Sequence, residues 1–78
     1  MRITPTQQRD LDTYEECQRL VIRFMGDVRK ARAWFSTPNH LLGGITPERM
    51  FLIGRTTKLL EIIKSLIEDN TPHERLAI

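Results

Sequence analysis

The sequence predicts an all-α fold, a small bundle of about four helices forming a single domain. Two observations support this class: apolar residues recur at spacings of three and four, and capping residues, glycines and prolines separate the apolar segments. No segment shows the alternation that would predict a β-strand. We expect one long N-terminal helix in residues 1–26, a compact three-helix unit in residues 27–70, and a mobile tail in residues 71–78.

The first helix has clear signals at both ends. Thr4 is a suitable N-cap, Pro5 suits the first helical position, and Gln7 completes a capping box. Gly26 accepts the left-handed conformation that commonly ends a helix. The residues that form the apolar face between these ends are Leu11, Tyr14, Cys17, Val21 and Phe24.

The second helix is expected to begin after Asp27, whose carboxylate can accept hydrogen bonds from free backbone N–H groups. It must end before Pro38, because proline disfavours helical geometry at the preceding residue. The connection that follows contains Leu41 and Leu42, which we expect to pack beneath the loop. Two glycines then favour a tight turn.

The third and fourth helices are also clearly bounded. Thr46-Pro47 repeats the start signal of the first helix, and Gly54 ends the short third helix. The fourth helix is expected over residues 56–69, with Leu59, Leu60, Ile62, Ile63, Leu66 and Ile67 apolar. Because this stripe is broad for a helix packed on one side only, we expect a second contact there and predict a homodimer.

Charge gives only weak information about partners. Twelve Lys and Arg residues against ten Asp and Glu residues give a net charge of +2. The only basic cluster is Arg29, Lys30 and Arg32, with Arg23 a turn earlier, and a solvated helix surface explains it more simply than phosphate binding. We therefore do not expect a nucleic-acid partner. No apolar run approaches the roughly 18–20 residues that span a bilayer, so no membrane association is expected.

The sequence offers no recognisable catalytic or metal-binding pattern. Cys17 is the only cysteine, so a disulfide within the chain is excluded, and its place on an apolar helix face favours a structural thiol. Cys17, His40 and His73 lack the spacing of metal ligands. No phosphate loop or dinucleotide fingerprint occurs. We predict a non-catalytic protein without a cofactor and, since no signal peptide is evident, a cytoplasmic one.

Three short motifs follow one another at close spacing in the middle of the chain. They are Ala31-Arg32-Ala33-Trp34-Phe35, Thr37-Pro38-Asn39 and Leu42-Gly43-Gly44-Ile45-Thr46-Pro47. The segment from Val28 to Asp69 resembles the toxin-binding domain of the Xre/MbcA/ParS antitoxin family. That family's pattern reads roughly Trp-Leu-x-x-Pro-Asn-x-x-Leu-Gly-Gly-x-Thr-Pro, and this chain departs from it by having Phe35 in place of the usual leucine.

The resemblance implies a helical domain that dimerises and binds a RES-type toxin. Such a toxin degrades NAD, and the antitoxin blocks access to its active site. We expect the motif residues Pro38, Leu42, Gly43, Gly44, Thr46 and Pro47 to be structural. The candidate partner-binding residues are Trp34, Phe35, Asn39, Leu59, Ile63 and Arg75. Trp34 and Phe35 have core packing as the simpler interpretation, although aromatic residues also dominate binding hot spots.

The chain differs from typical family members at its N-terminal end. Only 27 residues precede Val28, enough for one helix but not for the usual helix-turn-helix domain. We therefore expect a stand-alone toxin-binding domain. The alternative is a small adaptor or inhibitor that uses the same fold against a different host protein.

Overall fold

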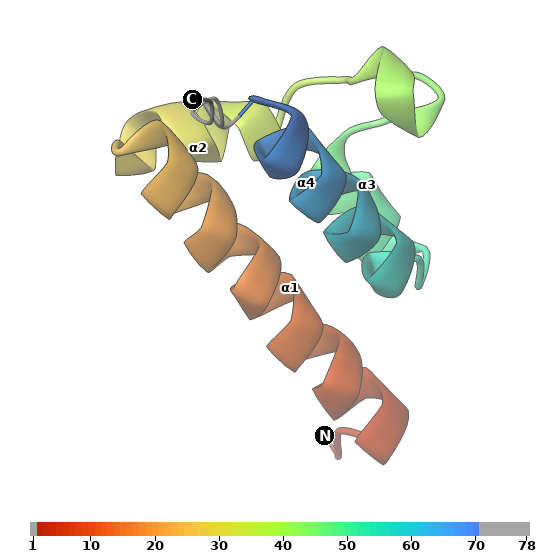
Figure 1. Ribbon diagram of the computed structural model, residues 1–78. Coiled ribbons are helices and arrows are strands. Elements are labelled where there is room, and N and C mark those ends of the chain that lie inside the picture. Colours follow the sequence, from red (N-terminus) through yellow and green to blue (C-terminus); the bar gives the residue numbers. More distant parts are fainter. Residues whose placement is uncertain (1, 71–78) are drawn as a thin grey trace.

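A computed structural model describes residues 2–70 of the chain, with the side chain of Asn70 left out. In chain order the elements are the α-helices α1 (Pro5–Met25) and α2 (Val28–Phe35), the short 3-10 helix η1 (His40–Leu42), and the α-helices α3 (Pro47–Leu52) and α4 (Thr56–Asn70) (Figure 1). The predicted all-α bundle is confirmed, and the described residues include no strand beyond one isolated bridge. The predicted mobile tail, residues 71–78, lies outside the described residues.

The ends of α1 follow from local hydrogen bonding. The Thr4 hydroxyl accepts a hydrogen bond from the Gln7 backbone N–H at 3.1 Å, and the Thr4 N–H donates to Gln7 Oε1 at 2.9 Å. This reciprocal pair satisfies two backbone donors that the helix itself cannot use. At the other end Gly26 has φ +69° and donates its N–H to the Ile22 carbonyl at 2.7 Å. The predicted bounds of this helix are confirmed.

The core forms where α4 lies along α1 while α2 crosses near the C-terminal end of α1 (Figure 1). The buried apolar side chains, which come from all four α-helices and η1, are Cys17, Val21, Ala31, Phe35, Leu42, Met50, Leu59 and Ile63. The first turns of α1 extend past the other helices, and residues 5–9 are exposed (Figure 1). Only the C-terminal two thirds of α1 therefore pack against the other helices to form the core.

A row of aromatic rings joins three of the helices. The Phe51 ring of α3 stacks on Tyr14 of α1, with centroids 4.3 Å apart and planes only 11° apart. Tyr14 in turn meets Phe35 of α2 edge to face at 5.5 Å. Phe35 meets Trp34 in the same manner at 5.1 Å. Offset and edge-to-face pairs of this kind add stability beyond the area they bury.

Among the described residues, no helix combines the length and the apolar character that crossing a bilayer requires.

The start of α4 contains a buried polar group. Thr56 is 0% exposed, and its hydroxyl has no hydrogen-bond partner within the described structure. Burying a hydroxyl without a partner costs roughly 1–3 kcal/mol in protein mutational data. The adjacent Thr57 is exposed.

We predict that Thr56→Val stabilises the fold, because valine keeps the shape of threonine and removes the unpartnered hydroxyl. The free energy of unfolding, measured by urea denaturation, should rise by about 1 kcal/mol. Thr57→Val is the matched control and should change it by less than about 0.5 kcal/mol. A loss of stability in Thr56→Val would show that the hydroxyl is satisfied in solution.

Candidate binding groove

The connection between α2 and α3 is organised around Asn39. Its side-chain oxygen accepts a hydrogen bond from the Leu41 N–H at 2.9 Å and so begins η1. Its backbone N–H donates to the Ile45 carbonyl at 3.0 Å, and its carbonyl accepts from the N–H groups of Leu42 and Gly44. One residue thereby closes the loop on both sides. Asn39 of the Pro-Asn motif therefore has a structural role in this turn.

The two glycines of the loop take conformations that suit glycine. Gly43 has φ +78° and Gly44 has φ +88°, both in the left-handed region that side chains with a Cβ atom disfavour. The chain reverses there and reaches Thr46, whose hydroxyl accepts from the Arg49 N–H at 3.0 Å. The prediction of a tight turn and a capped third helix is confirmed.

The two leucines of this connection differ in how far they are buried. Leu42 is buried, at 8% exposure, and joins the core. Leu41 is 51% exposed, so the expectation that both leucines pack beneath the loop is wrong for Leu41. The physical reason is that η1 places successive side chains in different directions around its axis, so only one of the two can face the core.

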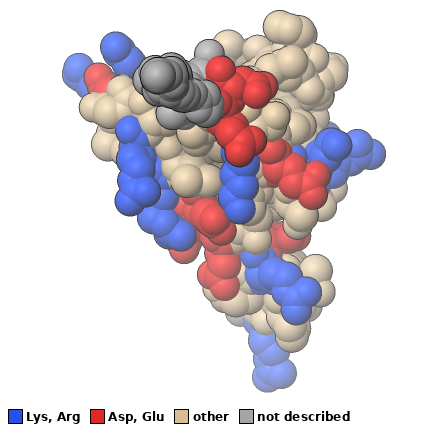
Figure 2. All heavy atoms as spheres, in the orientation of Figure 1, with Lys and Arg blue, Asp and Glu red and all other residues tan. Residues whose placement is uncertain are grey.

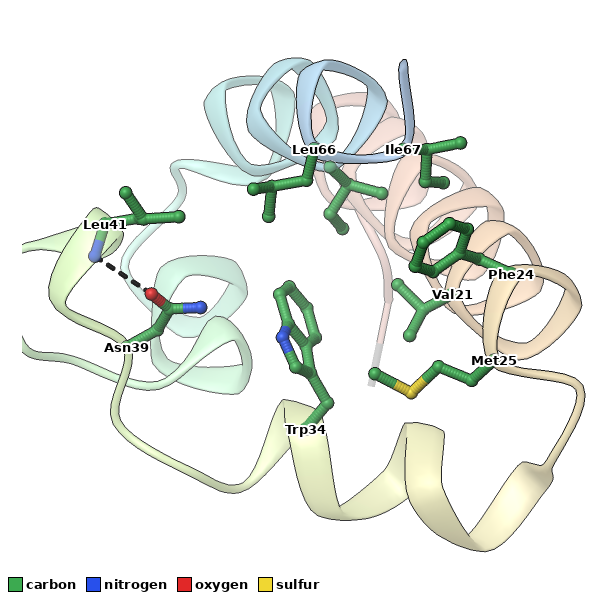
Figure 3. A pocket seen from close by; sticks show the side chains of 9 residues that line it. Val21, Phe24, Met25, Trp34, Asn39, Leu41, Leu66 and Ile67 are labelled. Carbon is green, nitrogen blue, oxygen red and sulfur yellow. Dashed lines mark hydrogen bonds between the residues drawn. The ribbon is translucent and has the colours of Figure 1, made fainter. Parts of the chain in front are cut away.

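An apolar groove opens between α1, α2, η1 and α4, with a volume of about 260 Å³ (Figure 3). One wall comes from α1, the other from α4, and the Asn39–Leu41 segment borders one end (Figure 3). The described residues of the lining are Val21, Phe24, Met25, Trp34, Asn39, Leu41, Ile63, Leu66 and Ile67, and of these only Asn39 is polar. The chemistry of this lining favours an apolar occupant.

Trp34 is the central side chain of this groove. Its indole projects from α2 into the space between the walls made by α1 and α4 (Figure 3). The ring is partly buried and is held edge to face against Phe35 at 5.1 Å. Phe24 on the α1 wall is 48% exposed, which is high for a large apolar side chain. The groove therefore presents two aromatic side chains to solvent.

The predicted partner-binding residues divide into three groups. Trp34 and Asn39 line the groove together. Leu59 and Ile63 are 0% and 1% exposed, so their side chains are enclosed within this chain, although Ile63 also forms part of the groove lining. Phe35 is likewise buried, and it lies behind Trp34 in the aromatic row. Arg75 lies outside the described residues.

Several groove residues were not among the predicted site residues. Phe24 was assigned only to the apolar face of the first helix and Leu41 only to the loop interior, and Met25 was assigned no role. Leu66 and Ile67 were part of the broad apolar stripe, which was the sequence signal for a contact on this side of α4. No spacing rule identifies the groove, because three helices and a turn meet to form it.

Charged side chains do not form one continuous basic surface on the face in view. In Figure 2, acidic side chains lie between the basic ones across that face. Arg29, Lys30 and Arg32 on α2 are exposed, as predicted for a solvated helix surface. Within the described part of the chain, no three His, Cys, Asp or Glu side chains come together in a way that could hold a metal ion.

The Cys17 thiol is enclosed in the core, where the sequence placed it. Burial, and secondarily the negative charge of Glu16, raises the pKa of the thiol from 9.0 to about 11. A thiol with such a pKa is protonated at neutral pH and is a poor nucleophile. The geometry therefore supports a structural role for this cysteine.

With this geometry established, the chain was compared with known proteins. Neither the family models, nor the curated proteins, nor the solved structures include a match to it.

We predict that Asn39→Ala destabilises the fold by about 1 kcal/mol, because the Leu41 N–H then loses its side-chain acceptor. Thermal and urea denaturation measure the loss. His40→Ala is the control, because His40 is exposed and adjoins Asn39 in the same turn. Equal stability of the two variants would mean that the asparagine side chain does not hold the turn.

The raised pKa of Cys17 predicts a pH dependence of stability. The folded state disfavours the thiolate form of Cys17. The stabilisation that comes from the protonated thiol is therefore fully present below about pH 9 and is lost as pH rises toward 11. The free energy of unfolding should fall in this window with an added slope of up to about 1.4 kcal/mol per pH unit. Cys17→Ala should lack this added slope and retain that of Tyr14, whose pKa is raised by burial and by Glu48. Parallel curves for the two proteins would contradict the prediction.

Proposed function

We propose that this chain is a non-catalytic protein-binding module that acts as an antitoxin, neutralising a RES-type NAD-degrading toxin by occluding its active site. The observation that carries the proposal is the motif from Trp34 to Pro47, which resembles that of the Xre/MbcA/ParS antitoxins. In the structure the same motif builds the Asn39 turn and supplies Trp34 to the apolar groove. Motif and groove thus share Trp34, Asn39 and Leu41.

The groove is suited to gripping a polypeptide. Those of its lining residues that the structure describes are apolar except for Asn39, and Trp34 and Phe24 offer the kind of aromatic surface that dominates protein–protein hot spots. Occlusion of an active site is steric, so it needs no nucleophile, base or metal in the antitoxin. A protonated, enclosed Cys17 thiol is in keeping with such a role.

We also propose that the chain forms a homodimer in the cytoplasm. Leu59 and Ile63 are enclosed within the chain, so a second copy would have to contact other apolar side chains. A second depression of about 310 Å³ at the α1–α3 junction is lined in part by Ile3, Leu11 and Leu52. Ile3 and Leu52 are 51% and 65% exposed, which supports this patch as the dimer contact.

The alternative function is that of a small adaptor or inhibitor that binds a different host protein through the same groove. Its supporting observation is that Phe35 stands where the antitoxin pattern has leucine, so the chain departs from that pattern within the motif itself. The groove and its chemistry would serve this function equally well. The two candidates therefore differ in the partner and not in the surface.

The test is co-expression with the product of the neighbouring gene, if that gene encodes a RES-type toxin. The chain should restore growth and co-purify with the toxin. Leu41→Asp, which places a charge at the exposed end of the groove, should weaken toxin binding at least about tenfold, because a charge is buried without a partner. Leu52→Asp is the matched control, since it makes the same change at an exposed leucine on the other patch.

Leu52→Asp should retain toxin binding and shift the chain toward the monomer in light scattering. If the wild-type chain fails to protect cells from the toxin, the antitoxin function is wrong. Capture of one non-toxin host protein that Leu41→Asp no longer binds would then favour the adaptor.

A further inference from the structure

Asn39 presents hydrogen-bond donors to the apolar groove. Its side-chain oxygen Oδ1 accepts from the Leu41 N–H at 2.9 Å, which fixes the oxygen end of the amide on the turn. The amide nitrogen Nδ2 then lies on the side of the groove that faces Trp34 (Figure 3). An amide NH₂ group carries two donors and is no acceptor. Asn39 therefore holds the turn with its oxygen and offers its nitrogen to the groove.

A second donor faces the same space. The indole nitrogen Nε1 of Trp34 lies on the edge of the ring that faces Asn39 (Figure 3). Within residues 2–70, neither this nitrogen nor Asn39 Nδ2 donates a hydrogen bond to another residue. The other described side chains of the lining contain no oxygen or nitrogen. Two donors thus meet where the described lining offers no oxygen except the one that the turn already uses.

We propose that the groove binds an apolar side chain of a partner polypeptide together with an adjacent main-chain carbonyl, whose oxygen accepts hydrogen bonds from Asn39 Nδ2 and Trp34 Nε1. This rests on the proposed function, which takes the groove as the protein-binding surface, and adds the chemistry of the segment that enters. While the groove is open, water can accept from both donors. An apolar segment displaces that water, so both donors lose their partners unless the segment brings an acceptor.

The acceptor is a neutral carbonyl, because the described lining contains no Lys, Arg or His side chain. A carboxylate would lose its hydration there without gaining a positive partner, which costs more than burying a hydrogen-bonded carbonyl. A peptide carbonyl that is already paired within a helix or sheet is not free to accept. The entering segment is therefore a loop, an extended stretch or the last turn of a helix, where carbonyls lack partners within the helix.

The size of the groove limits what can enter it. Its volume of about 260 Å³ exceeds the roughly 150 Å³ of an apolar cavity that accommodates benzene. This leaves room for one or two aliphatic side chains and not for a whole helix. Trp34 and the half-exposed Phe24 supply aromatic surface for these side chains. A leucine or a similar residue beside a free carbonyl fits both the volume and the donors.

Two substitutions separate the donors from the fold. Asn39→Asp keeps a side-chain oxygen that can accept from the Leu41 N–H, and it removes the amide donors. Trp34→Phe keeps an aromatic ring and removes the indole donor. His40→Asp is the charge control, because it adds the same negative charge at an exposed neighbour that is not among the described lining residues. Asn39→Asp should unfold at the same urea concentration as the wild-type chain.

The probe is 4-methylpentanamide, a neutral molecule with the branched chain of leucine and one amide carbonyl, titrated into the full-length chain. In proton–nitrogen NMR spectra we expect it to shift the side-chain amide signals of Asn39 and the indole signal of Trp34, the only tryptophan. Asn39→Asp and Trp34→Phe should each raise its dissociation constant about threefold or more, the usual effect of losing one hydrogen bond. The signal of the remaining donor reports this change. His40→Asp should leave the dissociation constant unchanged.

Three results would overturn the proposal. The first is that neither donor signal shifts with the probe up to its solubility limit. The second is equal binding of the probe to the wild-type chain and to folded Asn39→Asp. The third is tighter binding of 4-methylpentanoate than of the amide, because the groove would then prefer a charged acceptor. None of these measurements uses the toxin, so a chain that binds the amide without protecting cells would contradict only the antitoxin function.

Discussion

The structure depends most on the burial of Phe35 between Tyr14 and Trp34. Phe35 meets both rings edge to face, with centroids 5.5 Å and 5.1 Å away. The contact with Tyr14 of α1 fixes the rotation of α2 about its axis, because turning α2 would break it, whereas Trp34 belongs to α2 and turns together with Phe35. Successive helical residues lie about 100° apart, so a core position for Phe35 places Trp34 at the border between core and surface. The central position of Trp34 in the groove is thus a consequence of how Phe35 packs.

The Asn39 turn supplies a second constraint. It reverses the chain between α2 and α3 through a hydrogen bond from the Asn39 N–H to the Ile45 carbonyl and through two glycines with positive φ. The same turn leaves Leu41 at the edge of the groove while Leu42 enters the core. A chain of 78 residues has little interior volume for the apolar residues it carries. Leu41 and Phe24 are therefore not enclosed in the core, and both line the groove.

Features that depend on neighbouring residues were predictable from the sequence, and features that depend on distant ones were not. The capping box at Thr4, the end at Gly26 and the Thr46-Pro47 start each need only a few adjacent residues, and all are as predicted. The stacking of Tyr14 on Phe51 joins residues 37 positions apart, and no local pattern specifies it. For the same reason the broad stripe of α4 indicated two contacts without showing which residues make them: Leu59 is enclosed in the core, Leu66 and Ile67 line the groove, and Ile63 belongs to both.

An apolar groove on its own discriminates poorly between partners, because any apolar side chain of suitable size gains free energy by entering it. Specificity therefore depends on the polar groups at its edge. Among the described residues of the lining only Asn39 is polar, and its side-chain oxygen already accepts a hydrogen bond from the Leu41 N–H. The amide nitrogen of Asn39 is drawn on the side of the groove that faces Trp34 (Figure 3). A partner that places a hydrogen-bond acceptor near this amide and an apolar side chain against Trp34 would therefore bind in preference to an incidental apolar surface.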